Sequence, residues 1–262
     1  MSPRSIQPPA ARADDVAPAV RLDGVCKDFT LLHNGVRDLK ARVVGLFHRR
    51  WRPRPERFRA VADVTLTIAP GEAVALLGPN GSGKSTLLQL IAGILEPTSG
   101  TVRTHGRIAP LIELGVGFHP DLTGAENIYL NASLFGLANR ETRKRYDSIV
   151  RFAELDGFID TPVKNYSSGM YLRLGFAIAV HMDPDVMLAD EILAVGDEAF
   201  QDKCMDRIAQ MRAGGMTLIL VTHSRDQARR FCDRWVQLEH GRIVAEGRFA
   251  ETAATERAIA TA

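Results

Sequence analysis

The sequence predicts an α/β fold in which helices cover a mostly parallel sheet, with an antiparallel β edge and an inserted α-helical subdomain. Short apolar runs alternate with segments of helical periodicity, as expected for parallel strands buried on both faces. A mostly helical block at about 115–182 interrupts this alternation. The stretch WVQLEHGRIVAEG has a central His-Gly pair and predicts an antiparallel hairpin.

The composition is that of an ordinary globular protein, with 262 residues and a net charge of +2. Its three cysteines are far apart and form no CxxC pair, so neither a zinc site nor a disulfide framework is predicted. No apolar run approaches the roughly 18 residues of a membrane span. Residues 1–19 lack the apolar segment of a secretory signal and predict a disordered leader, and 248–262 predict a separate tail.

An insertion at about 35–59 separates a first strand, which begins at Val20, from a second with the sequence VADVTLTI. Apolar residues fall on one face of a possible helix in its first half, and the basic stretch HRRWRPRPERFR follows. The insertion is expected either to meet the anionic membrane surface of the cytoplasmic leaflet or a lipid pyrophosphate, or to be a solvated basic loop over a helix packed on the domain.

The run EAVALLG predicts a buried strand that enters a glycine-rich loop, and STLLQLIAGIL predicts the helix that follows. The loop fits the pattern G-x-x-x-x-G-K-[ST], whose backbone amides cradle nucleotide phosphates at a helix N-terminus. This predicts a P-loop NTPase core that binds ATP and Mg²⁺, with Lys84 contacting phosphates and Ser85 contacting the metal. The expected ATP-binding residues of the loop are Gly78, Pro79, Asn80, Gly81, Ser82, Gly83, Lys84, Ser85 and Thr86.

Two later strands end in polar residues suited to the same chemistry. VMLADE ends in Asp190, expected to hold Mg²⁺, and Glu191, expected to polarise the attacking water as the catalytic base. TLILVTH ends in His223, which lies where ligands of parallel sheets bind and is the candidate for contacting the γ-phosphate.

In this order and spacing, GPNGSGKST, YSSGM, VMLADE, AVGD and VTH resemble the ATP-binding cassette of ABC transporters. The resemblance covers about residues 20–247 and implies a homodimer in which two cassettes pack head to tail. It implies that the signature of one chain contacts the ATP held by its partner, so that hydrolysis opens the dimer. The residues at the signature position are Tyr166, Ser167, Ser168, Gly169 and Met170.

Three departures from the family pattern concern these sites. The signature has Tyr166, Ser168 and Met170 where the family has Leu, Gly and Gln, and only Asp197 matches in the D-loop. The Q-loop glutamine is absent, and Glu113 or its neighbour occupies the region that would contact the metal. Phe29 matches the position that stacks on adenine, and Phe58 is a second candidate.

YSSGM, LADEILAVGDEAFQ and LIELGVGFHPDLTGAENIYLN resemble the ATPases that export undecaprenyl-linked polysaccharides such as O-antigen, teichoic acid and some capsules. This implies a lipid-linked polysaccharide substrate, an integral membrane permease of the ABC-2 type, and a peripheral position on the cytoplasmic face of the bacterial inner membrane. It also implies that 118–127 meets the coupling helix of the permease. The chain is expected to lack the C-terminal carbohydrate-binding domain that some members carry.

Two alternatives remain open. One is the ATPase of an ABC-2-type exporter of a drug or a simple lipid, which the sequence separates only by its signature and D-loop. The other is a non-transport ABC ATPase acting on nucleic acid. Such proteins usually carry two cassettes or a long coiled coil, neither of which is present, so no nucleic-acid partner is expected.

Overall fold

The computed structural model describes residues 17–32, 55–112, 114–115, 117–190 and 196–249. The strands are β1 (Val20–Leu32), β2 (Pro55–Ile68), β3 (Ala73–Leu77), β4 (Ser99–Thr104), β5 (Ile108–Pro110), β6 (Val186–Asp190), β7 (Thr217–Val221), β8 (Arg234–Glu239) and β9 (Arg242–Arg248). The helices are α2 (Lys84–Ile91), α3 (Gly124–Leu134), α4 (Asn139–Ala153), η3 (Val163–Asn165, a 3₁₀ turn), α5 (Ser168–His181), α6 (Glu198–Ala213) and α7 (Arg225–Phe231).

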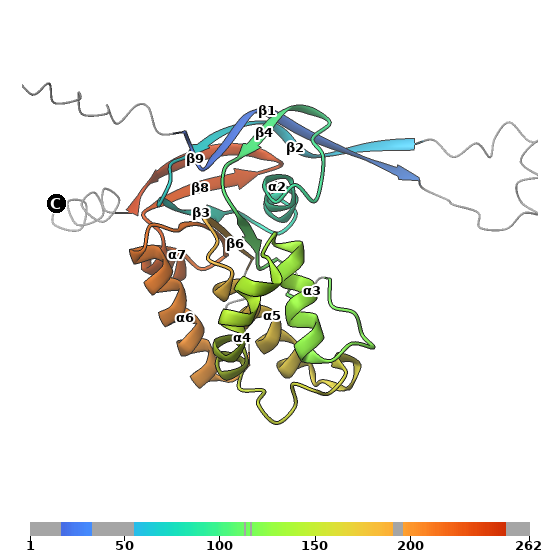
Figure 1. The fold of residues 1–262 in the computed structure, drawn as a ribbon. Helices are drawn as coiled ribbons and strands as arrows, with labels where there is room; N and C mark the ends of the chain where they lie inside the picture. Colours follow the sequence, from blue (N-terminus) through green and yellow to red (C-terminus); the bar gives the residue numbers. More distant parts are fainter. Residues whose placement is uncertain (1–16, 33–54, 113, 116, 191–195, 250–262) are drawn as a thin grey trace, which may run out of the picture.

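A six-stranded sheet with the order β5-β6-β7-β3-β8-β9 forms the centre of the molecule (Figure 1). Every neighbouring pair is parallel except β8 and β9, which form the predicted hairpin. His240 and Gly241, with φ of 48° and 76°, make its two-residue turn, in the left-handed conformation that such turns require. The prediction of a mostly parallel sheet with an antiparallel edge is confirmed.

The alternation of side chains along the central strands divides the core into two layers. In β3, Ala73, Ala75 and Leu77 pack on the side of α5, α6 and α7, whereas Val74 and Leu76 pack on the side of α2 and the second sheet. All five residues of β3 are buried. A strand buried on both faces needs an unbroken apolar run, which explains why EAVALLG shows no polar alternation.

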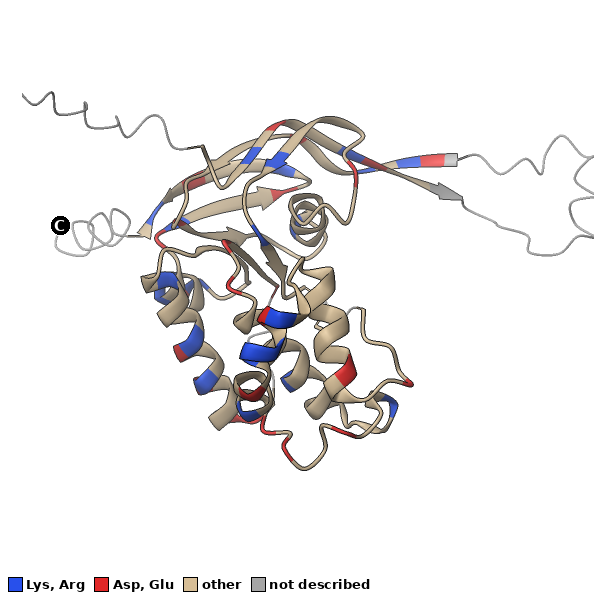
Figure 2. Ribbon diagram, in the orientation of Figure 1, with Lys and Arg blue, Asp and Glu red and all other residues tan. Residues whose placement is uncertain are grey.

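A separate antiparallel sheet with the order β2-β1-β4 covers the α2 side. The far ends of β1 and β2 extend beyond the body as a two-stranded arm, with β4 pairing no further along β1 than Cys26 (Figure 1). Residues 55–59, predicted to belong to the basic insertion, are instead part of β2. Their pairing with β1 explains this, because Arg59 Nε donates to Asp28 Oδ1 at 2.7 Å across the strands. Charges of both signs lie along the arm (Figure 2).

Helices α3, α4 and α5 pack together around an apolar cluster of their own, away from the second sheet (Figure 1). Helix α5 belongs to two cores at once: Leu174 and Ile178 face the helical cluster, and Phe176 and Val180 face the sheet. A helix that is apolar all round is buried on most sides, so α5 is held firmly between the two parts. Its N-terminus, however, remains at the surface, where Ser167 and Ser168 are exposed.

Among the residues that the structure describes, no helix combines the length and apolar character needed to cross a membrane. The insertion residues 35–54, the leader residues 1–16 and the tail residues 250–262 lie outside the described part of the chain, as do Glu113 and Glu191.

Candidate nucleotide site

The glycine-rich loop leaves β3 and turns tightly into α2. Gly78 and Gly83 have φ of 147° and 101°, in the region that favours glycine. A Cβ at Gly78 would overlap the carbonyl oxygen of Leu238, and one at Gly83 would overlap the carbonyl of Ala60. The two glycines are therefore required by both backbone conformation and close packing against neighbouring strands.

Two buried polar side chains lie within the loop. Lys84 is buried, and its Nζ donates to the carbonyl oxygens of Gly78 at 2.8 Å and Pro79 at 2.9 Å. Ser82 Oγ is also buried, with no hydrogen-bond partner among the described residues. Because a buried hydroxyl without a partner is costly, the loop has unused capacity to bind an oxygen-rich ligand. This arrangement fits a phosphate group.

The ends of three neighbouring strands meet at this loop. Leu76 of β3 pairs with Val221 of β7, and Val221 pairs with Asp190 of β6. The sheet thus brings Asp190 to the first turn of α2, where Ser85 Oγ donates to Asp190 Oδ2 at 2.9 Å. Glu191 follows Asp190 directly but lies outside the described residues, so its catalytic role stays a prediction.

His223 follows β7 at the same edge of the sheet, and its side chain is exposed. The structure thus places it beyond the strand between β3 and β6, as the sequence predicted. Its contact with the γ-phosphate stays a prediction. The preceding residue, Thr222, is buried and donates to Gln227 Oε1 at 2.7 Å, which holds the start of α7 against the strand end.

A pocket of about 540 Å³ opens over the loop. It is lined by Phe58, Ala60, Asn80, Gly81, Gly83, Lys84, Ser85, Thr86, Asp190 and Val221. Phe58 is 49% exposed and lines this pocket, whereas Phe29 faces Phe58 directly across the β1–β2 pair. Lys27 Nζ lies 5.4 Å from the centroid of the Phe29 ring. Phe58 is therefore the aromatic side chain that the structure brings to the loop.

The donor set also fits a magnesium ion. Mg²⁺ prefers oxygen ligands and is commonly held by one or two protein groups together with phosphates. Ser85 and Asp190 supply two such oxygens within hydrogen-bond distance of each other. In the described part of the chain, no group of three or more His, Cys, Asp or Glu side chains is arranged to hold a metal by itself.

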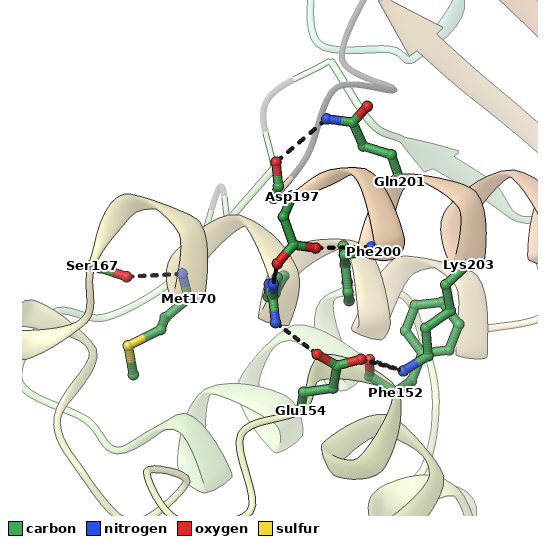
Figure 3. A network of polar contacts seen from close by, with 10 residues as sticks. Phe152, Glu154, Ser167, Met170, Asp197, Phe200, Gln201 and Lys203 are labelled. Carbon is green, nitrogen blue, oxygen red and sulfur yellow. Dashed lines mark hydrogen bonds and ion pairs between the residues drawn. The ribbon is translucent and has the colours of Figure 1, made fainter.

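The signature residues lie at the N-terminus of α5. Ser167 is the N-cap, and its Oγ accepts a hydrogen bond from the Met170 amide at 3.2 Å (Figure 3). A Cβ at Gly169 would have Ser167 Oγ as its nearest neighbour, at 3.9 Å, so this end of the helix is uncrowded. Exposed hydroxyls at the positive end of a helix dipole suit an anion.

Two departures from the family pattern have structural explanations. Tyr166 donates to the Phe158 carbonyl at 2.9 Å, and burial raises the pKa of Tyr166 to about 12. Gly124 at the start of α3 makes room for its hydroxyl. Met170 packs against the apolar cluster of the helical block. Both side chains thus fasten the signature to the helical block and leave Ser167 and Ser168 exposed.

An ion-pair network joins the signature helix to α6 (Figure 3). Arg173 donates to Asp197 Oδ2 and to Glu154 Oε2, each at 2.8 Å, and its guanidinium lies 4.8 Å from the centroid of the Phe200 ring. Asp197 also caps α6 by accepting from the Phe200 amide at 3.0 Å. The predicted D-loop residue is therefore engaged within its own chain, and its contact with a partner stays a prediction.

The segment that replaces the Q-loop lies between β5 and α3. Glu113 itself is outside the described residues, and its proposed contact with the metal stays a prediction. Asn127 is fully buried, and its amide contacts His119, Leu122 and Thr123, so this side chain shapes the turn before α3.

Sequence reasoning missed Arg173, Asn127 and Tyr171 as organising residues. An Asn one turn into the predicted helix, and charged and aromatic residues just after the signature, were the available signals.

Comparison with known proteins supports the assignment of a nucleotide site. The sequence pattern of the family described as "ABC transporter" matches residues 61–194, about half of the 262-residue chain. The O-antigen export system ATP-binding protein RfbB of Klebsiella pneumoniae is 44% identical over 229 residues, covering 86% of this chain and 92% of the relative. The teichoic acids export ATP-binding protein TagH of Listeria monocytogenes serotype 4b is 42% identical, covering 87% and 67%.

Among solved structures, a dimeric ATP-binding cassette in a post-hydrolysis state bound to ADP and Pi superposes with a TM-score of 0.68. It is 26% identical, and the match covers 87% of this chain and 98% of that one. The fold, the loop geometry and these relationships lead to one conclusion: the chain belongs to the ABC transporter family and is an ABC transporter ATPase related to the O-antigen and teichoic acid export ATPases.

Proposed function

We propose that this chain is the ATP-hydrolysing subunit of an exporter that moves a lipid-linked polysaccharide of the O-antigen kind across the bacterial inner membrane. It works as a homodimer beneath two copies of an ABC-2-type permease, on the cytoplasmic face of the membrane. The observation that carries the substrate class is the 44% identity to RfbB over 92% of that relative, which extends well beyond the common nucleotide motifs.

The dimer is proposed because the chain presents the two halves of a nucleotide site on separate surfaces. One half is the loop with Lys84, Ser85 and Asp190, which surround a single pocket. The other is the exposed N-terminus of α5, which is absent from the residues lining that pocket. In a head-to-tail pair each loop would face the signature of the partner, and the solved cassette of similar fold is dimeric.

The residues of the loop have distinct tasks in this proposal. Lys84 provides positive charge and bridges two carbonyls of the loop, while the backbone amides and Ser82 Oγ donate to phosphate oxygens. Ser85 and Asp190 hold Mg²⁺, which neutralises phosphate charge when bound. Phe58 stacks on the adenine. Glu191 takes a proton from the attacking water, and His223 orients it.

The permease is proposed to dock at an apolar pocket of about 190 Å³ between α3, α5 and the end of β5. Leu134 and Ile94 line it and are 67% and 52% exposed, which is unusual for large aliphatic side chains. A helix from a membrane subunit offers matching apolar side chains. Residues 118–127, which the resemblance implies meet the coupling helix, do not line this pocket themselves; in the chain they lie between Gly115 and Asn131, which do.

Changing Glu191 to Gln tests the proposal. The variant should bind ATP like the wild type, hydrolyse it at least about 100-fold more slowly, and accumulate as an ATP-bound dimer, measured by light scattering after gel filtration. Glu198→Gln, an exposed change nearby in the chain, is the matched control. Wild-type turnover by Glu191→Gln would remove Glu191 from the reaction. In cells, the variant should accumulate an unexported lipid-linked glycan; accumulation of none would contradict the substrate class.

A further inference from the structure

Tyr171, one turn into α5, contacts the segment that replaces the Q-loop. Its hydroxyl donates to the carbonyl of Gly115 at 2.9 Å. Its ring meets Phe118 edge to face, with centroids 4.9 Å apart and an interplanar angle of 68°. The Phe118 amide donates to the same Gly115 carbonyl at 3.0 Å, so both lone pairs of this oxygen are used.

Two glycines allow this close approach between a loop and a helix. Gly115 has φ of 82°, and a Cβ there would overlap the Tyr171 ring. A Cβ at Gly175, one turn further along α5, would lie 2.9 Å from the Gly115 amide nitrogen. At Gly115 the loop backbone therefore rests directly on the face of α5 that Tyr171 and Gly175 share.

The ends of the same segment are fastened to other parts of the molecule. At its start, the Leu111 amide donates to the Leu188 carbonyl of β6 at 2.7 Å. At its end, the His119 amide donates to Asn127 Oδ1 at 2.7 Å. Its described residues thus contact the sheet at Leu111, α5 at Gly115 and α3 at His119.

The crossing also lies at the surface where a partner is proposed to bind. Leu114, Gly115 and Gly175 line the same apolar pocket as the exposed side chains of Leu134 and Ile94. A group that enters this pocket would press on the loop at the point where Tyr171 holds it. The N-terminus of the same helix, four residues before Tyr171, begins with the cap Ser167.

We propose that Tyr171 is a positioning residue that fastens Gly115 and Phe118 to α5, so that occupancy of the apolar pocket and the placement of the signature change together. Tyr171 does not contact nucleotide in this scheme. It sets the orientation of the first turn of α5, and with it the direction of the amides that follow Ser167. This rests on the proposed composite site, in which those amides serve the ATP of the partner.

Tyr171→Phe tests the inference in the full chain, because phenylalanine keeps the ring and removes only the hydroxyl. The KM for ATP should be unchanged, since the loop of Lys84 is intact. The kcat should fall by about 3- to 10-fold, an upper range set by the free energy of the one hydrogen bond that holds the productive orientation of the signature. The Phe118 amide should exchange hydrogen several-fold faster. Tyr129→Phe, in the same helical block, is the matched control and should leave all three quantities unchanged.

Gly175→Ala provides an independent second variant. It keeps the Tyr171 hydroxyl but places a methyl group against the Gly115 backbone, so it should also lower kcat and speed exchange at Phe118. If Tyr171→Phe matches the wild type in both kcat and exchange, the inference is wrong. If the fall in kcat is fully explained by a smaller folded fraction, measured as a lowered melting temperature, Tyr171 has a merely structural role, and the inference is again wrong. Failure of the proposed function would be seen differently, because the wild type itself would neither hydrolyse ATP nor dimerise.

Discussion

Ser85 Oγ donates a 2.9 Å hydrogen bond to Asp190 Oδ2, although the two residues lie 105 positions apart in the chain. The contact exists because β3 and β6 flank β7 in the sheet, so that the loop after one strand and the carboxylate at the end of another share an edge. Two oxygen atoms that suit a metal ion are thereby placed together in the pocket that Lys84 also lines.

Asp190→Asn should abolish Mg²⁺-dependent hydrolysis while leaving the fold intact. Asparagine retains an acceptor for the Ser85 hydroxyl but loses the charge that a divalent cation requires, so we expect kcat to fall by about 100-fold or more. Steady-state hydrolysis across a Mg²⁺ titration measures this, with the exposed α6 change Asp202→Asn as the control. An unaltered Mg²⁺ dependence would show that Asp190 is not a ligand.

Lys84→Ala should weaken ATP binding by about 10- to 100-fold, the effect of losing hydrogen bonds from a charged donor. The same change removes the two contacts with Gly78 and Pro79 that shape the loop. Titration calorimetry measures the affinity, and Lys144→Ala on the exposed face of α4 is the matched control. Equal affinities in the two variants would contradict the assignment of Lys84.

Phe58→Ala and Phe29→Ala together identify the adenine-stacking residue. Because Phe58 lines the pocket, its removal should lower ATP affinity roughly tenfold, a typical loss for one base–aromatic contact. Phe29→Ala should leave the affinity near that of the wild type. Tripolyphosphate has no base, so its binding should be equal in both variants. The opposite ranking for ATP would assign the stacking role to Phe29.

Ser168→Arg should block hydrolysis without blocking nucleotide binding. Ser168 is exposed in the single chain, so an arginine is accommodated there, but it would hold the partner's loop away from the signature backbone. We expect wild-type ATP affinity, no ATP-dependent dimer, and at least about a tenfold loss of kcat. Asn139→Arg at the exposed start of α4 is the control. Full activity of Ser168→Arg would count against a site shared by two chains.

Two of the three cysteines should be unreactive in the native protein. Burial raises the pKa of both Cys204 and Cys232 to about 12, so their reactive thiolate forms are scarce at neutral pH. Cys26 is only partly buried. Titration with a thiol reagent at pH 8 should therefore modify at most one thiol per chain before denaturant is added and three afterwards. Modification of two or more in the native state would contradict this packing.

The sequence by itself determined the parallel core and the residues of the phosphate loop. Both are local properties: a strand buried on two faces must be uniformly apolar, as in β3, and a tight phosphate-binding turn must contain glycines, as at Gly78 and Gly83. The hairpin turn at His240 and Gly241 was predictable for the same reason, since positive φ angles restrict the residue types.

Only the tertiary structure decided which distant groups meet. Residues 55–59 read as a basic loop but form a strand, because their partner is Asp28 and its neighbours on β1 rather than anything nearby in the chain. The contacts of Arg173 with Asp197, of Tyr171 with Gly115, and of Phe58 with the pocket likewise depend on how helices and sheets pack. Periodicity reports which face of an element is buried, but it carries no information about what lies opposite that face.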